Sequence, residues 1–327
     1  MDIVKCLIYV LVFPGVLFTL ILSLFLAGID RKLVARMQRR QGPPILQPLY
    51  DSLKLLGKDS IVPKSASRKL YLIAPLIGLA SALSIPLFIP IYQNVFIPYS
   101  GDVILIIYLL TICGASLVLG GSSSGSHLAG IGASREVVTM IAYELPMVIA
   151  ILSVCRKAGQ ILGIGSVYSM VGIQAAQSAN GASISNWVLI PAALAFLMVI
   201  PAEVGVVPFD IAEAETEICE GPLVEYSGIY LAMYKITSNI KAFIMSGLFV
   251  ALFLGGNGLA ITESGIANCI LNIVLYLVLV FVVMFITITL PRSVVGRLKI
   301  NQALKFFWTI PTALSLISFI LVTLQIG

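Results

Sequence analysis

The chain contains eight long runs of apolar residues, separated by shorter polar connections. The runs cover approximately residues 7–27, 71–90, 103–121, 137–155, 187–207, 229–253, 267–290 and 306–325. A helix needs about 20 mostly apolar residues to cross a membrane, and it satisfies its backbone hydrogen bonds internally. The runs are continuous, unlike the short alternating strands of an outer-membrane barrel. The pattern therefore predicts eight membrane-spanning helices, of which the least regular contains Lys235 and Lys241.

Composition strengthens this interpretation. Hydrophobic residues make up 59% of the 327 residues, charged residues make up 11%, and the mean hydropathy is +1.05. A soluble domain carries about 25% charged residues. We therefore expect an all-α integral membrane protein with a single polytopic domain over residues 1–327. The first run is too long for the core of a signal peptide, so we interpret it as a retained helix.

The distribution of Lys and Arg predicts the orientation in the membrane. Ten of the 20 basic residues lie in the connection 28–69, and four more lie in 291–305. Because short cytoplasmic loops are enriched in Lys and Arg, we place 28–69, 122–136, 208–228 and 291–305 in the cytoplasm and both termini outside. Arg156 and Lys157 are exceptions that this topology places outside.

The first cytoplasmic connection carries a second pattern besides its charge. Pro43 and Pro44 stop a helix, and the residues that follow them alternate between apolar and polar faces. The segment 45–57 is therefore predicted to form a short amphipathic helix in the membrane interface. The basic residues by themselves also fit a lipid anchor. Alternatively, this connection is the surface on which a peripheral protein sits.

The cysteines offer no metal chemistry of their own. Five of them are scattered singly along the chain, without a CxxC pair or a His-rich partner. An iron–sulfur cluster needs grouped thiolates, and zinc needs grouped Cys or His ligands. We therefore predict that this chain holds no metal and that any redox metal belongs to another protein. The sequence shows no P-loop, no dinucleotide fingerprint and no internal repeat, and the last absence argues against an inverted-repeat transporter.

Two acidic residues lie inside predicted spans. Glu144 is about two turns into its helix and precedes Pro146, and Glu203 lies near the cytoplasmic end of another helix. A charged carboxylate at such depth is costly unless it is paired, protonated or hydrated. One interpretation is a carboxyl group hydrogen-bonded to a neighbouring helix, and the other is a proton acceptor with a raised pKa. Arg135 and Glu136 are expected at the entrance of the same helix as Glu144.

The third cytoplasmic connection contains the stretch "FDIAEAETEICEGPLVEY", which has no Lys or Arg. Its six acids are Asp210, Glu213, Glu215, Glu217, Glu220 and Glu225. Spacing predicts a shared helix face for Glu213, Glu217 and Glu220. Repulsion between like charges favours protons on some of these groups near neutral pH. We expect Lys235 and Lys241 to counter the acids, and the alternative is a solvated acidic loop.

Four stretches together resemble one family. They are "DRKLVARMQRRQGPPILQPLYDSLKLLGK", "GASREVVTMIAYELP", "PAEVGVVPFDIAEAETEICEGPLVEYSG" and "TLPRSVVGRLKINQALKFFW". In this order they resemble the membrane-anchor subunit (subunit 1, or H) of respiratory complex I and of related energy-converting membrane hydrogenases and sulfane-sulfur reductases. The resemblance covers essentially the whole chain and implies a multi-pass subunit in the cell membrane of a prokaryote.

The resemblance also implies partners and roles. It implies peripheral hydrogenase-like large and small subunits, antiporter-like membrane subunits, the lipid bilayer and no nucleic acid. Iron–sulfur clusters and a nickel–iron-type site are expected on partner subunits, and no catalytic residue is expected here. A proton or coupling pathway is implied for Glu144, Glu203, Asp210, Glu213, Glu215, Glu220, Glu225, Arg135 and Lys235. We expect Arg36, Arg39 and Arg40 to dock the peripheral arm.

One departure separates two branches of the family. The respiratory enzymes usually have an Arg where this chain has Val206, whereas "GASRE" and "ICEGPLVEYSG" are more similar to the hydrogenase branch. The favoured function is therefore an energy-coupling subunit of a hydrogenase or sulfane-sulfur reductase complex. The alternatives are the quinone-site subunit of a complex I-like quinone reductase and a free-standing transporter that uses Glu144 and Glu203 as proton carriers.

Overall fold

The computed structural model describes residues 10–13, 15–91, 99–255 and 265–325. All regular structure within these residues is helical, which confirms the all-α prediction. Seven stretches are long and apolar enough to cross a membrane. Three of them are single helices: α5 (Asp102–Ser123), α6 (His127–Ile161) and α13 (Ile300–Thr323). Two combine an α-helix with a 3-10 turn: α4 (Arg68–Ser84) with η1 (Ile85–Leu87), and η3 (Trp187–Leu189) with α8 (Ile190–Val204). The last two contain a π-helix: α10 (Gly228–Phe249) with η5 (Val250–Leu254), and α11 (Gly265–Met284) with η6 (Phe285–Thr289) and α12 (Leu290–Val294). The eighth expected span, 7–27, lies partly outside the described residues. Most of its described part belongs to α2 (Val16–Met37).

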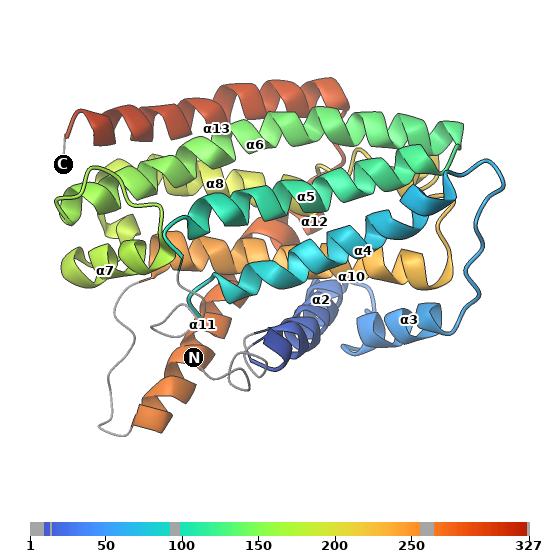
Figure 1. Ribbon diagram of the computed structural model, residues 1–327, viewed down its shortest axis with the longest axis horizontal. Coiled ribbons are helices and arrows are strands. Elements are labelled where there is room, and N and C mark those ends of the chain that lie inside the picture. The colour runs from blue at the N-terminus through green and yellow to red at the C-terminus, as the bar shows by residue number, and fades with distance from the viewer. Residues whose placement is uncertain (1–9, 14, 92–98, 256–264, 326–327) are drawn as a thin grey trace.

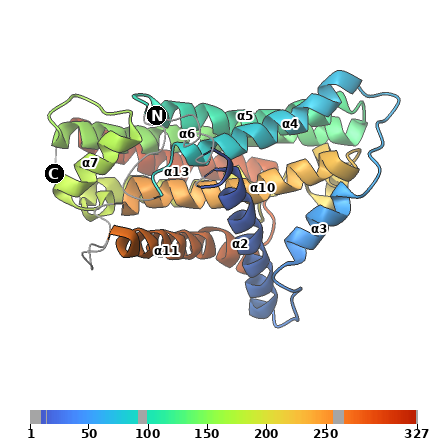
Figure 2. The same cartoon turned by 60° about the horizontal axis from the view of Figure 1, so that its bottom comes forward.

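The long helices form an elongated bundle. In Figure 1, α13, α6, α5 and α4 run side by side along the long axis, with α8 and α10 packed behind them. Figure 2 shows α2 and α11 on one side of this bundle, with α2 steeply inclined to the other helices. Both contact α10, which also packs against α4 and α8. Two short helices complete the fold, α3 (Gln47–Leu56) and α7 (Met170–Asn180).

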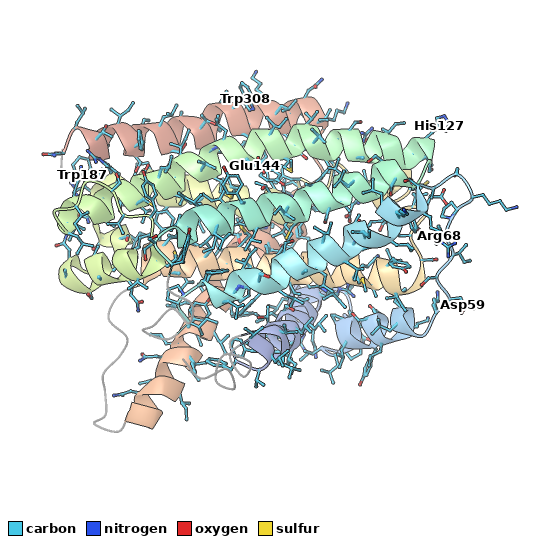
Figure 3. All side chains as sticks on the ribbon, in the orientation of Figure 1. Asp59, Arg68, His127, Glu144, Trp187 and Trp308 are labelled. Atoms are coloured by element: carbon cyan, nitrogen blue, oxygen red, sulfur yellow. The ribbon has the colours of Figure 1, made fainter. Side chains whose placement is uncertain are left out.

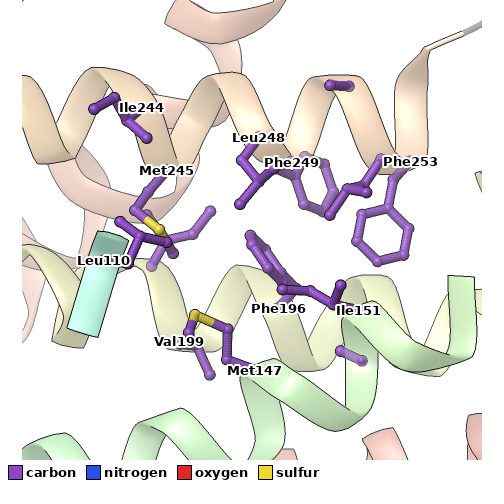
Figure 4. Packing of buried hydrophobic residues seen from close by; sticks show 14 of the residues in the cluster. Leu110, Met147, Ile151, Phe196, Val199, Ile244, Met245, Leu248, Phe249 and Phe253 are labelled. Carbon is purple, nitrogen blue, oxygen red and sulfur yellow. The ribbon is translucent and has the colours of Figure 1, made fainter. Parts of the chain in front are cut away.

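The second half of α10 lies in the middle of the bundle and is enclosed on all sides. Every residue from Ile240 to Phe253 is buried. Around this stretch Phe196 of α8 lies 6.1 Å from Phe249 and 6.0 Å from Phe253 between ring centroids (Figure 4). Because lipid is as apolar as these side chains, close packing rather than the hydrophobic effect holds such helices together. The core thus fixes α8 against α10, and these two helices carry the buried charges described below.

The acidic connection does not form the predicted helix. Only α9 (Glu215–Ile218) and the single turn η4 (Gly221–Leu223) are helical there, and the shared face of Glu213, Glu217 and Glu220 is wrong. Three consecutive residues, Cys219, Glu220 and Gly221, adopt positive φ angles of 50°, 68° and 51°. Such angles end a right-handed helix. At Gly221 a side chain is also sterically forbidden, because a Cβ atom would collide with the carbonyl oxygen of Ala212.

The connection expected over 122–136 is much shorter than predicted. Helix α5 ends at Ser123 and α6 begins at His127, so most of the expected loop is helix. This polar start of α6 packs against η4, and Gly132 makes room for Pro222: a Cβ there would lie 2.6 Å from its Cδ. Hydropathy marks only the lipid-facing length of a helix, whereas these turns are stabilised by protein contacts. Arg135 and Glu136 therefore lie more than two turns inside α6.

Candidate functional site

A small central cavity of about 50 Å³ lies between α5, α6, α8, α10 and the start of the acidic connection. Five of its lining residues are Asp, Glu or Lys, namely Glu136, Glu203, Asp210, Glu213 and Lys241. Four acids thus face one base. Its volume holds water, which needs only about 10–15 Å³ in this measure.

The base of this cavity is paired. The Lys241 Nζ atom of α10 lies 2.9 Å from a carboxylate oxygen of Glu203 in α8, and their side chains are only 9% and 3% exposed. Two charges of opposite sign at this distance compensate each other's loss of water, at a net cost or gain that depends on the surrounding hydrogen bonds. The partner of Lys241 is thus an acid of α8, whereas we expected Lys241 to counter the acids of the third cytoplasmic connection. Among the other acids of this cavity, Asp210 pairs with Arg297, whereas no ion pair is found for Glu136 or Glu213 among the described residues.

Glu144 lies farther along α6 and is half-buried (Figure 3). The carboxyl group of Glu144 interacts electrostatically with Glu203 and Lys241. The neighbouring Tyr143 is only 1% exposed, and its hydroxyl group has no hydrogen-bond partner among the described residues. Pro146 has no N–H group, so it removes the usual intrahelical partner of the Ala142 carbonyl. The stretch around Glu144 therefore combines a carboxyl group, a hydroxyl group and a spare carbonyl acceptor.

A second, larger cavity opens toward the acidic connection. We call it the loop cavity; its volume is about 320 Å³. Its charged lining comes from α2 (Asp30, Arg31), the acidic connection (Asp210, Glu213, Glu215, Glu220), α10 (Lys235) and α12 (Arg292). The central and loop cavities share Asp210 and Glu213, together with Val204, Gly205, Tyr234 and Ser238. Asp210 and Glu213 therefore form the boundary between them.

Arg297 of the last connection forms an ion pair with one of the two boundary acids. The Arg297 Nη2 atom donates to Asp210 at 2.8 Å. Elsewhere in the loop cavity, Asp30 accepts from Arg292 at 3.0 Å and from the Thr289 hydroxyl at 2.6 Å. Thr289 ends the π-helix η6, a type of helical irregularity that is frequent at functional sites.

The two boundary acids have raised pKa values. Burial raises the pKa of Asp210, and the guanidinium of Arg297 opposes the shift. Burial also raises the pKa of Glu213 to about 8, and the negative charges of Asp210 and Glu136 act in the same direction. Removal from water disfavours the charged form of a carboxyl group. The raised pKa favours the protonated form of Glu213 near neutral pH.

The remaining predicted acids lie at the periphery. Glu217 forms an ion pair with Arg135, Lys235 lies 3.7 Å from Glu220, and Glu215 is exposed in the loop cavity. Glu225 lies outside both cavities; its backbone carbonyl accepts a hydrogen bond of 2.7 Å from the Tyr71 hydroxyl. The structure thus brings Glu203, Asp210, Glu213, Glu215 and Glu220 to the two cavities, and Glu203, Asp210 and Glu220 have basic partners. Glu225 lies apart from them.

Sequence reasoning did not select four residues that this site uses. Glu136 was noted only as part of a helix entrance, although it lines the central cavity. Tyr143, Asp30 and Arg297 were not selected at all. Their partners are distant in sequence: Asp30 is 262 residues from Arg292, and Arg297 is 87 residues from Asp210. No local spacing could have revealed these pairs.

The expected docking residues lie at the end of α2. Arg36, Arg39 and Arg40 are exposed. Beyond them α3 confirms the predicted amphipathic helix, with Leu49, Leu53 and Leu56 exposed on one side and Pro48 and Ser52 buried on the other. In the described part of the chain, no group of three or more His, Cys, Asp or Glu residues has a geometry that could hold a metal ion.

Comparison with known proteins identifies the family of this chain. The sequence profile described as NADH dehydrogenase matches residues 8–323. The chain belongs to this family. Hydrogenase-4 component C of Escherichia coli (strain K12) is 35% identical over 237 residues, which cover 72% of each chain. The H subunit of the NADH-quinone oxidoreductase of Geobacillus kaustophilus (strain HTA426) is 30% identical over 322 residues, which cover 94% of this chain and 91% of that one.

A solved structure matches the family assignment at the level of the fold. It is a chain of the membrane-bound sulfane sulfur reductase, described as an archaeal respiratory membrane complex. The TM-score is 0.84 at 31% identity, over 93% of this chain and 96% of that chain. Family members of both the quinone oxidoreductase type and the hydrogenase type are therefore similar to this chain. Together with the seven spans, they identify a multi-pass membrane subunit of a complex I-like oxidoreductase.

Proposed function

We propose that this chain is the membrane-anchor and energy-coupling subunit of a membrane-bound hydrogenase or sulfane sulfur reductase complex. In this role it docks the peripheral redox arm and links electron transfer to the translocation of protons or sodium ions. The similarity to hydrogenase-4 component C and to the sulfane sulfur reductase chain supports this branch. Val206, at the place where the respiratory enzymes usually carry an Arg, supports it as well.

One observation carries the coupling role. Titratable groups line the loop cavity and the central cavity, which share Asp210 and Glu213, and Glu144 lies farther along α6, outside both linings. Protonation of any of these groups alters the field at the next. A redox change in a docked arm therefore reaches Glu144 as an electrostatic signal.

The partners follow from the same proposal. Iron–sulfur clusters and a nickel–iron-type site belong to hydrogenase-like large and small subunits, which bind the acidic connection and the exposed Arg36 and Arg39. Antiporter-like membrane subunits receive the coupling signal. The solitary cysteines support this division, because Cys113 and Cys155 are buried singly and Cys219 is exposed singly.

A second candidate function rests on the loop cavity. Its volume of about 320 Å³ falls in the range of small-molecule sites, so a complex I-like quinone reductase is the alternative. The cavity includes Val206 in its lining, which provides no guanidinium group for a quinone headgroup. Quinone-dependent oxidation by the purified complex would favour this alternative, and hydrogen- or polysulfide-dependent turnover without quinone would favour the first.

The coupling role is tested by Glu144→Gln and Glu215→Gln. Both changes keep the shape of the side chain, so we expect the complex to assemble. Ion translocation in reconstituted vesicles should fall by about 100-fold or more, the lower range of what a positioned proton-transfer group contributes. Electron transfer to a soluble artificial acceptor should stay normal, because the metals lie on other subunits.

The matched control is Asp59→Asn. Asp59 is an exposed acid far from Glu144 (Figure 3) and lines neither the central nor the loop cavity. This variant should translocate ions normally. A full ion gradient at the normal electron-transfer rate in both Gln variants would refute the proposed pathway.

A further inference from the structure

A third cavity lies at the cytoplasmic end of α2, and three of its seven lining residues are arginines. It has a volume of about 280 Å³, and its walls are Arg31, Val34 and Ala35 of α2, Arg40, Gln41 and Pro43 of the following connection, and Arg292 of α12. We call it the arginine cavity. It adjoins the loop cavity at Arg31 and Arg292, but its lining contains no acidic residue.

The cavity is built by a chain reversal at the end of α2. Arg39 adopts a left-handed conformation with φ of 56°, and the Arg40 N–H donates to the Ala35 carbonyl at 2.9 Å. This bond closes the helix end in the manner of a Schellman motif. The chain then lies flat on α2, because a Cβ at Gly42 would come within 2.9 Å of the Ala35 Cβ, and one at Gly28 would collide with the Ile45 carbonyl. The position of Arg40 is thus fixed by the backbone.

The charges around this cavity do not cancel. The Arg31 Nη1 atom donates to Asp51 at 3.0 Å, and the Arg292 Nη1 atom donates to Asp30 at 3.0 Å. Arg40 has no acidic partner among the described residues. Each guanidinium has five N–H donors, so the two paired arginines also keep donors to spare. A group that enters this cavity therefore meets an excess of positive charge and of N–H donors.

The cavity lies at the level of the lipid headgroups. Arg292 belongs to the end of the span Ile270–Val294, and the exposed leucines of α3 mark the membrane interface on the other side of α2. Below the reversal, Leu17, Ile21 and Phe25 are 51%, 63% and 43% exposed. Their spacing of four places them on the face of α2 that continues to Gly28. An apolar stripe thus follows α2 up to Gly28, where the backbone of Ile45 covers the helix.

We propose that the arginine cavity binds the phosphate group of an anionic membrane lipid. One guanidinium group can donate two parallel N–H bonds to one phosphate group. Basic pockets between helices on the cytoplasmic side also bind anionic lipid headgroups. The volume is several times the roughly 30 Å³ share of one water in the liquid. Arg40, which sequence alone grouped with Arg36 and Arg39, has this lipid as its partner. The proposal is independent of which substrate the complex reduces.

The test uses native mass spectrometry of the intact, delipidated complex in mild detergent. The probes are phosphatidylglycerol, phosphatidylcholine and inorganic phosphate. We expect Arg40→Gln to weaken phosphatidylglycerol binding about fivefold, the effect of one basic residue near an anionic surface. Arg40→Lys should retain most of the affinity. The control Lys305→Gln changes an exposed base that neither lines the cavity nor belongs to the proposed docking residues, and it should bind phosphatidylglycerol normally.

Each probe distinguishes a different source of the ligand. Binding of phosphatidylglycerol that depends on Arg40 and is absent for phosphatidylcholine supports the lipid site. Arg40-dependent binding of inorganic phosphate alone overturns it in favour of a soluble phosphate ligand. Loss of the peripheral subunits from Arg40→Gln, with lipid binding unchanged, overturns it in favour of an acidic protein partner. Equal lipid binding by Arg40→Gln and wild type overturns it outright.

Discussion

Glu213 is the single residue whose environment constrains proton movement most. It lines both the central and the loop cavity, and its carboxyl group is half-buried beside Asp210. Lys235 is the base that acts on it from α10, while Glu136 and Glu220 act with the opposite sign. Burial outweighs the attraction of Lys235. A neutral carboxyl group both donates and accepts a hydrogen bond, so Glu213 bridges the two cavities as long as it keeps its proton.

This state has a defined pH range. The pKa of Glu213 is raised to about 8, so the folded protein retains the proton while an unfolded chain loses it near the ordinary value. The contribution to stability is present at low pH and is lost as pH rises toward about 8. We predict that coupled ion translocation declines as pH rises through about 8. In Glu213→Gln this decline should disappear, because the amide does not titrate.

The measurement is the ratio of ions translocated to electrons transferred, from pH 6 to about 9, the range around the shifted pKa. Asp59→Asn serves as the control, since Asp59 lies outside both cavities, and should keep the wild-type profile. A decline near pH 8 that persists unchanged in Glu213→Gln would assign it to another group.

At the scale of elements, the Glu203–Lys241 pair joins α8 to α10 inside the bundle. Both side chains are almost completely buried. Removal of one partner leaves the other charge buried and uncompensated, which costs about 3–5 kcal/mol. We predict that Lys241→Met lowers the thermal stability of the purified complex markedly.

The double variant Glu203→Gln/Lys241→Met provides the matched comparison. It removes both charges at once, so we expect it to recover most of the lost stability, as measured by thermal unfolding in detergent. A double variant that is no more stable than Lys241→Met would show that the pair does not determine the packing of α8 against α10.

Elements that face lipid were the predictable ones. Apolar length predicted the seven observed spans, and the prolines and alternation of 43–57 predicted α3, because lipid selects such patterns directly. The start of α6 and the acidic connection were missed for the opposite reason. Arg135, Glu136 and Glu213 are positioned by protein contacts, and the left-handed residues Cys219 and Glu220 give no sequence signal for their conformation.

The candidate site divides in the same way. Glu144 and Glu203 were identifiable because an acid in an apolar run is unusual. Lys241 was identifiable as a base within such a run. The cavities themselves depend on the pairing of segments far apart in the sequence, such as Asp210 with Arg297. Only the folded chain shows that Glu225 lies apart from the other acids.

At the scale of the whole molecule, the distribution of basic residues predicts the side on which each connection lies. Ile61 follows α3 and is 71% exposed, and Ile164 follows α6 and is 62% exposed. We predict that Ile61→Cys reacts with a membrane-impermeant thiol reagent only from the cytoplasm, and Ile164→Cys only from the outside. Both belong in a background without the five native cysteines, because Cys219 is exposed.

Each variant serves as the control for the other, since the two positions differ in side but not in reagent. Intact right-side-out and inverted vesicles separate the two faces. Labelling of Ile61→Cys from the outer face alone would reverse the orientation and place the acidic connection outside.

The length of α6 has a mechanical consequence. Its 35 residues span about 52 Å, and Pro146, a natural hinge, lies near the middle. Arg135 is eleven residues, or about 16 Å, from that pivot. A swing of about 5° displaces Arg135 by about 1.4 Å, enough to disturb its ion pair with Glu217, but Glu144, two residues from the pivot, by only about 0.3 Å. The helix behaves as a lever with its pivot at Pro146, next to the half-buried Glu144, so a peripheral movement changes the electrostatic potential at Glu144 with little displacement.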